Sequence, residues 1–497
     1  TGIGSLSFNQ GGVTYLPGTS VSLDALIRAD LKNEIYTFSE NELRINELAL
    51  KFDGTVDLAG NDPDIQLSFE AAENTFRNFL SLVPAIYQKD FADIRSNGRL
   101  SFTGFVRGTY TENALPSFGL DIMVADGEFQ YPDLPAPVRN INFEANISNP
   151  GGEADGTVID IKKFRFTMIE NPVELRLLVM NPVSDPYIDG SLNGFFDLSA
   201  VDKVYPLGEG ESITGSIESD ITLKGRQSAI EAQQFQDFEA SGSLKVDGFS
   251  YSMQGFAHGF GISHALMIFS PAFIDVVNLD FSYADSDMKL KGKTENYIPY
   301  LTGSGPLKGA FTASSSFFNI NNFMEGDEEI PADDASTAGD SLVLEAFMVP
   351  ADIDLSLDVM FGRVLYDNIE LENVKGEVSV KDQKISLKGL RGNIFDGSIA
   401  MDGSYSTKNT AEPIVGLTVG IENMNFVKAF NTFGILEKFA PVFSHMVGSF
   451  STDMSLNTIL KEDLDPDWTT LVAQGLMNTS ALKVENVNTL NRLSDAL

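Results

Sequence analysis

The sequence predicts an all-β protein with a few short helices, in which a long, curled and mostly antiparallel sheet forms an open, taco-like hydrophobic groove. The main observation is a strict alternation of apolar and polar residues, the period of strands that bury one face. Between Ser212 and Gly225, isoleucine, leucine and small residues alternate with serine, threonine and charged residues. Turn residues interrupt this pattern about every 8 to 12 residues, as in an antiparallel meander.

An amphipathic sheet must cover its apolar face, and there are several ways to do so. A second sheet gives a sandwich, closure gives a barrel, and curling gives a trough that something else fills. A sandwich protein of this length would break into units of about 100 residues with linkers between them. Because the sequence contains only one clear linker, we favour the trough, and the sandwich stays open as the alternative.

In chain order, we expect an N-terminal β segment over residues 1–95, with an amphipathic helix near 73–92. Central β-groove repeats follow over 96–323. The acidic, almost apolar-free stretch 324–341 is expected to be a flexible linker. Residues 342–497 form a C-terminal β-groove module, and we expect the chain to be truncated at both ends relative to a longer protein.

Short helical patterns recur in a fixed context. They lie around residues 76–87, 195–205 and 426–439. A glycine that opens an alternating strand follows such a segment at Gly98, Gly215, Gly309 and Gly448. We interpret this recurrence as one architectural module repeated along a long sheet, although any β protein reuses turn-glycine-strand units.

Composition argues against several classes of function. The net charge of −36 is incompatible with a nucleic-acid partner, which needs a surplus of lysine and arginine. The chain has no cysteine and only three histidines, His258, His264 and His445, so we expect no cofactor, no metal site and no enzyme activity. Asp285 and Asp287 are a conceivable carboxylate pair, but their context favours a turn and a solvent-facing position. Gly292-Lys293-Thr294 lacks the upstream glycine of a phosphate-binding loop.

Targeting segments are absent from the sequence as given. The most apolar stretch, 260–277, is interrupted by polar residues, proline and an aspartate, and no signal peptide precedes Thr1. We therefore expect a soluble excerpt of a longer protein, with any membrane anchor outside it.

Several short motifs resemble the AsmA-like family of bacterial envelope proteins. Leu371-Glu372-Asn373-Val374-Lys375-Gly376 is followed by a Phe395-Asp396-Gly397-Ser398 turn, an order typical of the C-terminal region of that family. Residues 286–292, 307–309 and 318–321 are similar to the module that precedes it. Ser81-Leu82-Val83-Pro84 and Tyr131-Pro132-Asp133-Leu134 are similar to the branch found in Bacteroidetes-type bacteria.

This resemblance implies a β-groove protein akin to TamB and YhdP and related in plan to bridge-like lipid-transfer proteins. Such proteins are anchored in the inner membrane by an N-terminal helix and reach across the periplasm. The implied function is phospholipid transfer between membranes, which supports outer-membrane biogenesis and integrity. The implied partners are phospholipid acyl chains, the inner membrane through an anchor outside this chain, and an outer-membrane or envelope protein.

We expect the apolar phase of the clearest strands to line the groove, whereas in a sandwich the same residues would form an ordinary core. The set comprises Leu175, Leu177, Val179, Ile217, Ile221, Leu223, Leu244, Val246, Leu279, Phe281, Leu355, Leu357, Val359, Ile385 and Leu387. The main alternative is a periplasmic or surface β-sandwich that acts as a scaffold or subunit of an envelope complex without lipid cargo. A glycan hydrolase is a more distant alternative, because no catalytic carboxylate pair has a clear place.

Overall fold

A computed structural model describes residues 2–10, 13–71, 75–82, 94–132, 134–208, 210–253, 259–323, 348–410, 412–432, 441–461 and 466–484. The protein is all-β with a few short helices, and the 24 strands within these residues belong to one long, mostly antiparallel open sheet. This confirms the expected class and sheet, and it departs from the two packed sheets of a sandwich. The strong curl expected for a taco-like groove is not confirmed.

The chain divides into two compact units, which we describe separately. Unit 1 comprises Thr1–Gly208, Ser212–Val246 and Ile268–Ala272, and unit 2 comprises Glu209–Glu211, Asp247–Met267 and Phe273–Leu497. The domain boundaries expected after residues 95, 323 and 341 stay predictions. The acidic segment 324–341 lies outside the described residues.

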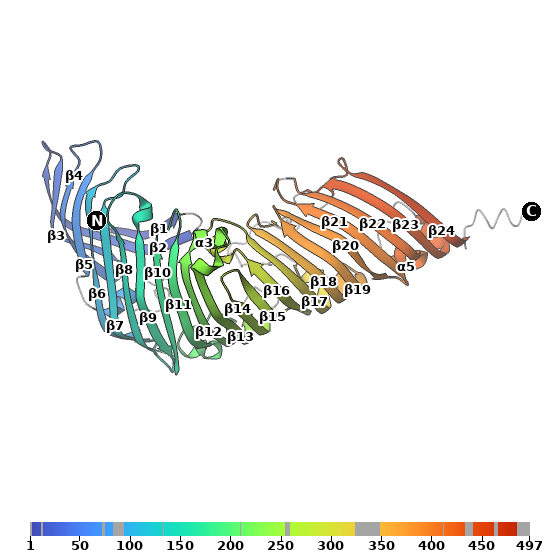
Figure 1. Ribbon diagram of the computed structural model, residues 1–497, viewed down its shortest axis with the longest axis horizontal. Helices are drawn as coiled ribbons and strands as arrows, with labels where there is room; N and C mark the ends of the chain where they lie inside the picture. Colours follow the sequence, from blue (N-terminus) through green and yellow to red (C-terminus); the bar gives the residue numbers. More distant parts are fainter. Residues whose placement is uncertain are drawn as a thin grey trace, which may run out of the picture. The chain divides into compact units, whose positions relative to one another are not determined.

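Unit 1 is a meander in which each strand from β1 to β12 pairs antiparallel with the next. Because β1 pairs with β2 and β2 pairs with β3, the row of strands begins at β1 (Figure 1). The strands are β1 (Gly2–Gln10), β2 (Val13–Asp30), β3 (Ile35–Ile45), β4 (Leu48–Asp57), β5 (Asp64–Ala71), β6 (Arg95–Thr109), β7 (Ser117–Gln130), β8 (Val138–Asn149), β9 (Val158–Met168), β10 (Asn171–Met180), β11 (Tyr187–Asp197), β12 (Ser212–Arg226) and β13 (Phe238–Ser252), whose last residues belong to unit 2. The helical segments are α1 (Phe76–Leu80), η2 (Ala154–Gly156), η3 (Leu198–Lys203), α3 (Gln227–Glu231) and η4 (Phe235–Asp237).

Unit 2 has the same meander with one exception. The neighbours β17 and β18 run parallel, whereas the other pairs from β15 to β24 are antiparallel. The strands are β14 (Phe260–Phe269), β15 (Phe273–Tyr283), β16 (Ser286–Glu295), β17 (Leu307–Asn319), β18 (Ile353–Tyr366), β19 (Ile369–Lys381), β20 (Lys384–Ile394), β21 (Gly397–Ser406), β22 (Ile414–Asn425), β23 (Met446–Ile459) and β24 (Val472–Val484). The helical segments are α4 (Tyr297–Leu301), η5 (Ile320–Phe323), α5 (Phe426–Thr432) and η6 (Pro441–His445).

The expected helices are present in shorter form. Helix α1 supplies the first turn of the helix expected near 73–92, and residues 83–93 lie outside the described part. Around 195–205 the prediction is partly wrong, because Phe195 and Phe196 belong to strand β11 and only η3 is helical. Helix α5 matches the start of the third pattern, and residues 433–440 lie outside the described part.

The recurring glycines lie near the start of strands that follow a helical segment. Strand β6 follows α1, β12 follows η3, β17 follows α4, and β23 follows α5 and η6. Gly98 has φ 122° and Gly448 has φ 129°, values that other residues rarely adopt. A Cβ atom on Gly98 would lie 2.7 Å from the Cα of Gly127 on the neighbouring strand. Glycine therefore allows both the backbone conformation and the close approach at this point.

Candidate functional site: the apolar face of the sheet

In unit 1, strand pairing joins apolar side chains into continuous rows on one face. Residues directly opposite each other on neighbouring antiparallel strands point to the same face. Two adjacent rows run from β6 to β12. The first consists of Leu100, Val124, Phe143, Phe164, Leu175, Leu192 and Ile221, and the second of Phe102, Ile122, Ala145, Ile161, Leu177, Gly190 and Leu223.

Unit 2 has equivalent rows. One row extends from β17 to β24, across the parallel pair β17–β18 and the antiparallel pairs that follow. A second row extends from β18 to β22 across antiparallel pairs. The first consists of Phe311, Leu357, Val378, Leu387, Gly403, Leu417, Leu456 and Ala473, and the second of Leu355, Val380, Ile385, Tyr405 and Val415.

Most of the residues predicted to line a groove belong to these rows or to rows beside them. Val179 lies opposite Ile159 and Ile188, and Ile217 lies opposite Phe196. Leu279 and Phe281 of β15 lie opposite Leu290 and Met288 of β16, and Val359 of β18 lies opposite Ala313 and Gly376. Leu244 and Val246 lie in β13. The structure thus distributes the predicted set over the two units rather than gathering it at one point.

Sequence reasoning missed other members of the same rows. Phe164 and Ile161 of β9 and Leu192 of β11 contact the predicted residues across the sheet but were not singled out. Their alternation with polar neighbours is the signal that identifies them, because β9 and β11 have the same period as β10 and β12.

The apolar face is only partly shielded from water. Among the predicted lining residues, Val246 and Val359 are buried, whereas Leu175, Ile221, Leu357 and the others are half-buried. In a sandwich these side chains would be buried against a second sheet. The face therefore retains apolar surface that is accessible to a binding partner.

Where α1 lies on the sheet of unit 1, the same face becomes a buried core. Phe76 and Leu80 of α1 pack with Leu100 of β6 and Val124 of β7. The helix is held there because the Asn46 side chain donates a hydrogen bond of 2.7 Å to the carbonyl oxygen of Ser81, directly after the helix. Short helices therefore cover local parts of the face.

Helix α5 and η6 do the same in unit 2. Phe426 of α5 is fully buried, and its ring packs against Phe443 and Phe450 at centroid distances of 5.0 and 4.8 Å. Ile394 and Ile421 of the sheet belong to the same cluster. Asn425 caps the N-terminus of α5, since its side-chain oxygen accepts a hydrogen bond of 3.0 Å from the backbone N–H of Lys428.

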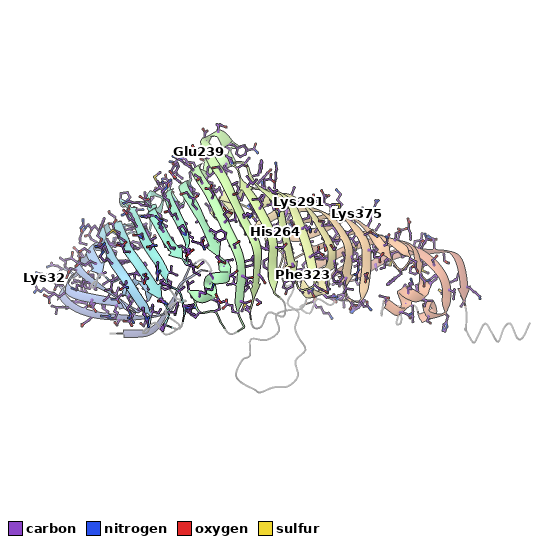
Figure 2. The ribbon with its side chains drawn as sticks, turned by 90° about the horizontal axis from the view of Figure 1, so that it is seen from below. Lys32, Glu239, His264, Lys291, Phe323 and Lys375 are labelled. Atoms are coloured by element: carbon purple, nitrogen blue, oxygen red, sulfur yellow. The ribbon has the colours of Figure 1, made fainter. Side chains whose placement is uncertain are left out.

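The opposite face of the sheet carries the charges. Figure 2 shows Lys291 and Lys375 on one side of unit 2 and Phe323 on the other. Phe323 packs with Phe318, which in turn contacts Phe361 of the apolar face. Cross-strand ion pairs occupy the polar face: Arg165–Glu174, Arg176–Asp189, Lys224–Asp189, Lys289–Asp280 and Lys381–Asp354.

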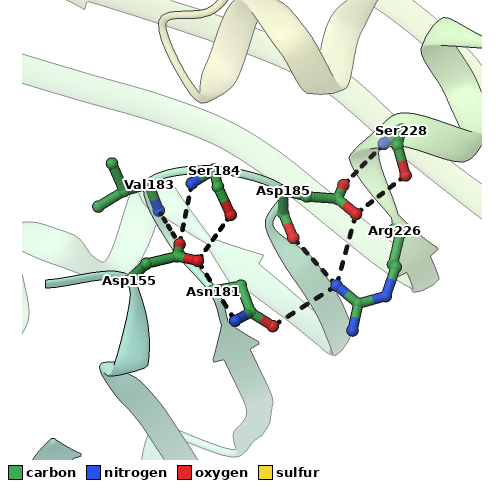
Figure 3. A network of polar contacts seen from close by, with 7 residues as sticks. All are labelled: Asp155, Asn181, Val183, Ser184, Asp185, Arg226 and Ser228. Carbon is green, nitrogen blue, oxygen red and sulfur yellow. Dashed lines mark hydrogen bonds and ion pairs between the residues drawn. The ribbon is translucent and has the colours of Figure 1, made fainter. Parts of the chain in front are cut away.

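Two carboxylates link successive turns at one edge of unit 1 (Figure 3). Asp155 accepts hydrogen bonds from the backbone N–H groups of Val183 and Ser184 and from the Ser184 hydroxyl, at 3.1, 2.9 and 2.6 Å. The Ser184 bonds, the side-chain bond first, lower the pKa of Asp155. Asp185 accepts from Ser228 N and Oγ at 2.9 and 3.0 Å and forms an ion pair with Arg226. These acids are engaged in holding the turns together.

The Asp285/Asp287 pair is also structural. Asp285 accepts a hydrogen bond of 2.5 Å from the Asn322 side chain, and Asp287 accepts from the backbone N–H groups of Ser316 and Phe317, both at 2.9 Å. Burial alone would raise the pKa of Asp287, but the hydrogen bonds from the Phe317 and Ser316 backbone outweigh it and lower the pKa. Both acids tie the β15–β16 turn to β17 and η5. Asp285 lies in the expected turn, whereas Asp287 is half-buried in β16 and does not face solvent as expected.

Other candidate chemistry stays unsupported in the described ranges. His264 Nδ1 lies 2.7 Å from Asp247 Oδ1 on the exposed surface, and no group of three or more His, Asp or Glu side chains among the described residues has the geometry of a metal site. Gly292-Lys293-Thr294 lies in strand β16, near its end at Glu295, and not in a loop. His258 lies outside the described residues.

Tyr131 is a buried titratable residue within the core cluster that includes Phe76 and Leu80 of α1. Its ring packs edge-on against Phe129 and Tyr205 at centroid distances of 6.4 and 6.1 Å. Burial, with a smaller contribution from Tyr205, raises the pKa of Tyr131 to about 12. The phenol is therefore neutral at physiological pH and belongs to the core.

Comparison with known proteins gives no assignment: no family model, no curated protein and no solved structure matches the chain. None of the helices in the described ranges has the length and apolar character needed to cross a bilayer.

Proposed function

We propose that the apolar face is the floor of an open groove that holds phospholipid acyl chains. The observation that carries this proposal is the continuity of the apolar rows, which run from strand to strand within each unit while most of their side chains stay half-buried. A monomer rarely leaves so large an apolar surface accessible without a partner for it.

The energetics of lipid movement favour such a surface. Moving an acyl chain through water costs about 0.8 kcal/mol per CH₂, so roughly 12 kcal/mol for a sixteen-carbon chain. A continuous apolar face removes most of this barrier without any reactive residue. The proposed activity is therefore non-enzymatic transfer of phospholipid along the sheet.

The resemblance of the short motifs to those of the AsmA-like family supports a location for this activity. We place the protein in the periplasm of a Gram-negative envelope, attached to the inner membrane through a segment outside this chain. There the transfer of phospholipid between membranes would support outer-membrane biogenesis and integrity. An envelope or outer-membrane protein is the proposed partner at the receiving end.

Lipid mass spectrometry on protein purified gently without added lipid tests the proposal. We expect several co-purifying phospholipids per chain. A folded, lipid-free protein that instead holds another envelope protein on its apolar face would overturn lipid transfer and favour the scaffold alternative.

Matched acidic substitutions on the two faces sharpen the test. Ile221→Glu places a charge in the apolar row of β12, whereas Thr222→Glu places it on the exposed polar face one residue away. We expect Ile221→Glu to reduce bound lipid several-fold and Thr222→Glu to leave it unchanged. Because Ile221 is half-buried, both variants should fold, as circular dichroism would verify. Equal lipid content in the two variants would contradict the assignment of the face.

In unit 2, Leu357→Glu and the control Thr312→Glu make the same comparison on neighbouring strands. Leu357 lies opposite Phe311 and Val378 on the apolar face, and Thr312 lies opposite Lys291 and Asp358 on the polar face. Loss of lipid in Leu357→Glu alone is the expected result. Unfolding of Leu357→Glu would indicate a buried core at this point instead of a groove.

A further inference from the structure

The apolar rows contain no charged side chain. Across the pairs of strands whose register the structure describes, lysine and arginine occupy the alternate phase and so lie on the opposite face. In unit 1, Arg165 follows Phe164, Arg176 follows Leu175, and Lys224 follows Leu223. In unit 2, Lys388 follows Leu387 in the same way. A negatively charged group held above the uncovered strands of these rows would find no lysine or arginine within the rows themselves.

Several cations of the polar face form ion pairs with neighbouring carboxylates. Arg176 and Lys224 share the carboxylate of Asp189, and Lys381 Nζ lies 2.6 Å from Asp354 Oδ2. The chain as a whole carries a net charge of −36. The electrostatic field around the sheet is therefore negative, and it is weakened by salt over a Debye length of about 8 Å at physiological ionic strength.

From this charge distribution we infer that the groove takes phospholipids whose headgroup carries no net charge, such as those with a zwitterionic ethanolamine headgroup, and disfavours anionic ones. This inference rests on the proposed lipid-binding function and deepens it. The acyl chains give the binding energy and are common to all phospholipids. The headgroup remains near the open side, where the only discrimination comes from the negative field of the protein.

Uptake from mixed vesicles measures this discrimination directly. Delipidated protein is incubated with vesicles of equimolar phosphatidylethanolamine and phosphatidylglycerol, separated from them, and its lipids are quantified by mass spectrometry. Because both lipids are presented by the same vesicle, repulsion between vesicle and protein affects them equally. We expect bound phosphatidylethanolamine to exceed phosphatidylglycerol about three-fold at low salt, and the ratio to approach one at about 0.5 M salt.

A cation introduced into an apolar row tests whether the lack of positive charge in the rows is what disfavours anionic headgroups. Leu192→Lys adds a positive charge between Leu175 and Ile221, and Leu192→Gln is the matched uncharged control. We expect Leu192→Lys to raise the bound fraction of phosphatidylglycerol at least two-fold over Leu192→Gln at low salt.

The possible results distinguish the inference about headgroups from the proposed lipid binding. Uptake of both lipids in equal amounts at low salt, or a preference for phosphatidylglycerol in the unmodified protein, overturns the inference about headgroups while leaving lipid binding intact. Failure to take up either lipid overturns the proposed function and this inference with it.

Discussion

The strands beneath α1 and the strands that follow them in unit 1 share the same rows of side chains but differ in burial. Leu100 and Val124, beneath the helix, are each 2% exposed. Further along the same row, Leu175, Leu192 and Ile221 are only half-buried. Since the alternation of residues is the same in both regions, the strand pattern does not decide burial on this sheet. In this row the difference comes from the short helix α1 inserted between β5 and β6.

Unit 2 repeats this contrast with different elements. Ile394 and Ile421 are buried beneath α5 and η6, whereas Leu357 and Leu387 are half-buried. Stability and accessibility are therefore assigned to different parts of one face. The covered parts supply a packed core, and the remaining parts keep the surface for which we propose acyl chains as the occupant.

The largest expected effect of a single substitution lies in the covered part of unit 2. Phe426→Ala removes a fully buried ring that packs on Phe443 and Phe450, so we expect a loss of about 3–5 kcal/mol in the free energy of unfolding. Leu387→Ala, on the half-buried part of the face, is the control and should cost about 1 kcal/mol. Urea unfolding followed by circular dichroism gives both values. Equal losses would mean that α5 does not create the main core of this unit.

Two substitutions within one row of unit 1 compare the stability contributed by its buried part with that contributed by its half-buried part. Leu100→Ala should cost about 2–4 kcal/mol, because it leaves a cavity beneath α1. Leu175→Ala removes the same atoms from a half-buried site, where water or lipid replaces them, and should cost about 1 kcal/mol. The unfolding midpoints of the two variants measure the difference. A cost for Leu175→Ala as large as that for Leu100→Ala would show that the second region is also covered.

The alternation of apolar and polar residues was sufficient to predict which side chains share the apolar face, because antiparallel pairing keeps apolar residues of neighbouring strands on the same face. A hairpin places each apolar residue opposite another one, so Leu175, Ile221 and Leu387 join their rows without any knowledge of the register. In Val246-Asp247-Gly248-Phe249 the alternation shifts by one residue, which predicts a bulge or tight turn, and Gly248 has φ 61° inside β13.

Other features were beyond sequence reasoning for physical reasons. Helices α3 and α4 each have five residues, too few for a period of 3.6 to be recognised. The parallel pair β17–β18 depends on the path of the chain between the two strands, and local alternation contains no information about that path. The positive φ angles of Asp126 and Asn373 shift the strand phase at points where the sequence offers only a polar residue.

The Asp287 carboxylate gives a smaller effect that depends on pH. Its pKa is lowered in the folded state, so its contribution to stability is complete above the ordinary value near 3.8 and is lost as the pH falls through the lowered pKa. Asp287→Asn should therefore lower stability by about 1 kcal/mol at pH 7, through weaker bonds to the Ser316 and Phe317 N–H groups. Hydrogen exchange of β16 and β17 at pH 7 and at pH 3 measures the change. A difference between variant and parent that persists unchanged at pH 3 would contradict this assignment.

The smallest expected effect comes from the polar face. Glu174 forms an ion pair with Arg165 at 3.2 Å, and both side chains are about half exposed, so the pair contributes roughly 0.2–1 kcal/mol. Glu174→Gln should therefore lower the unfolding midpoint slightly, with a difference that disappears in high salt. Glu174 and Leu175 are adjacent in β10 and point to opposite faces, so Glu174→Gln should leave bound lipid unchanged, whereas Leu175→Glu should reduce it. Lipid loss in both variants would show that the two faces of the sheet are not functionally distinct, and would remove the basis on which the apolar rows were chosen as the site.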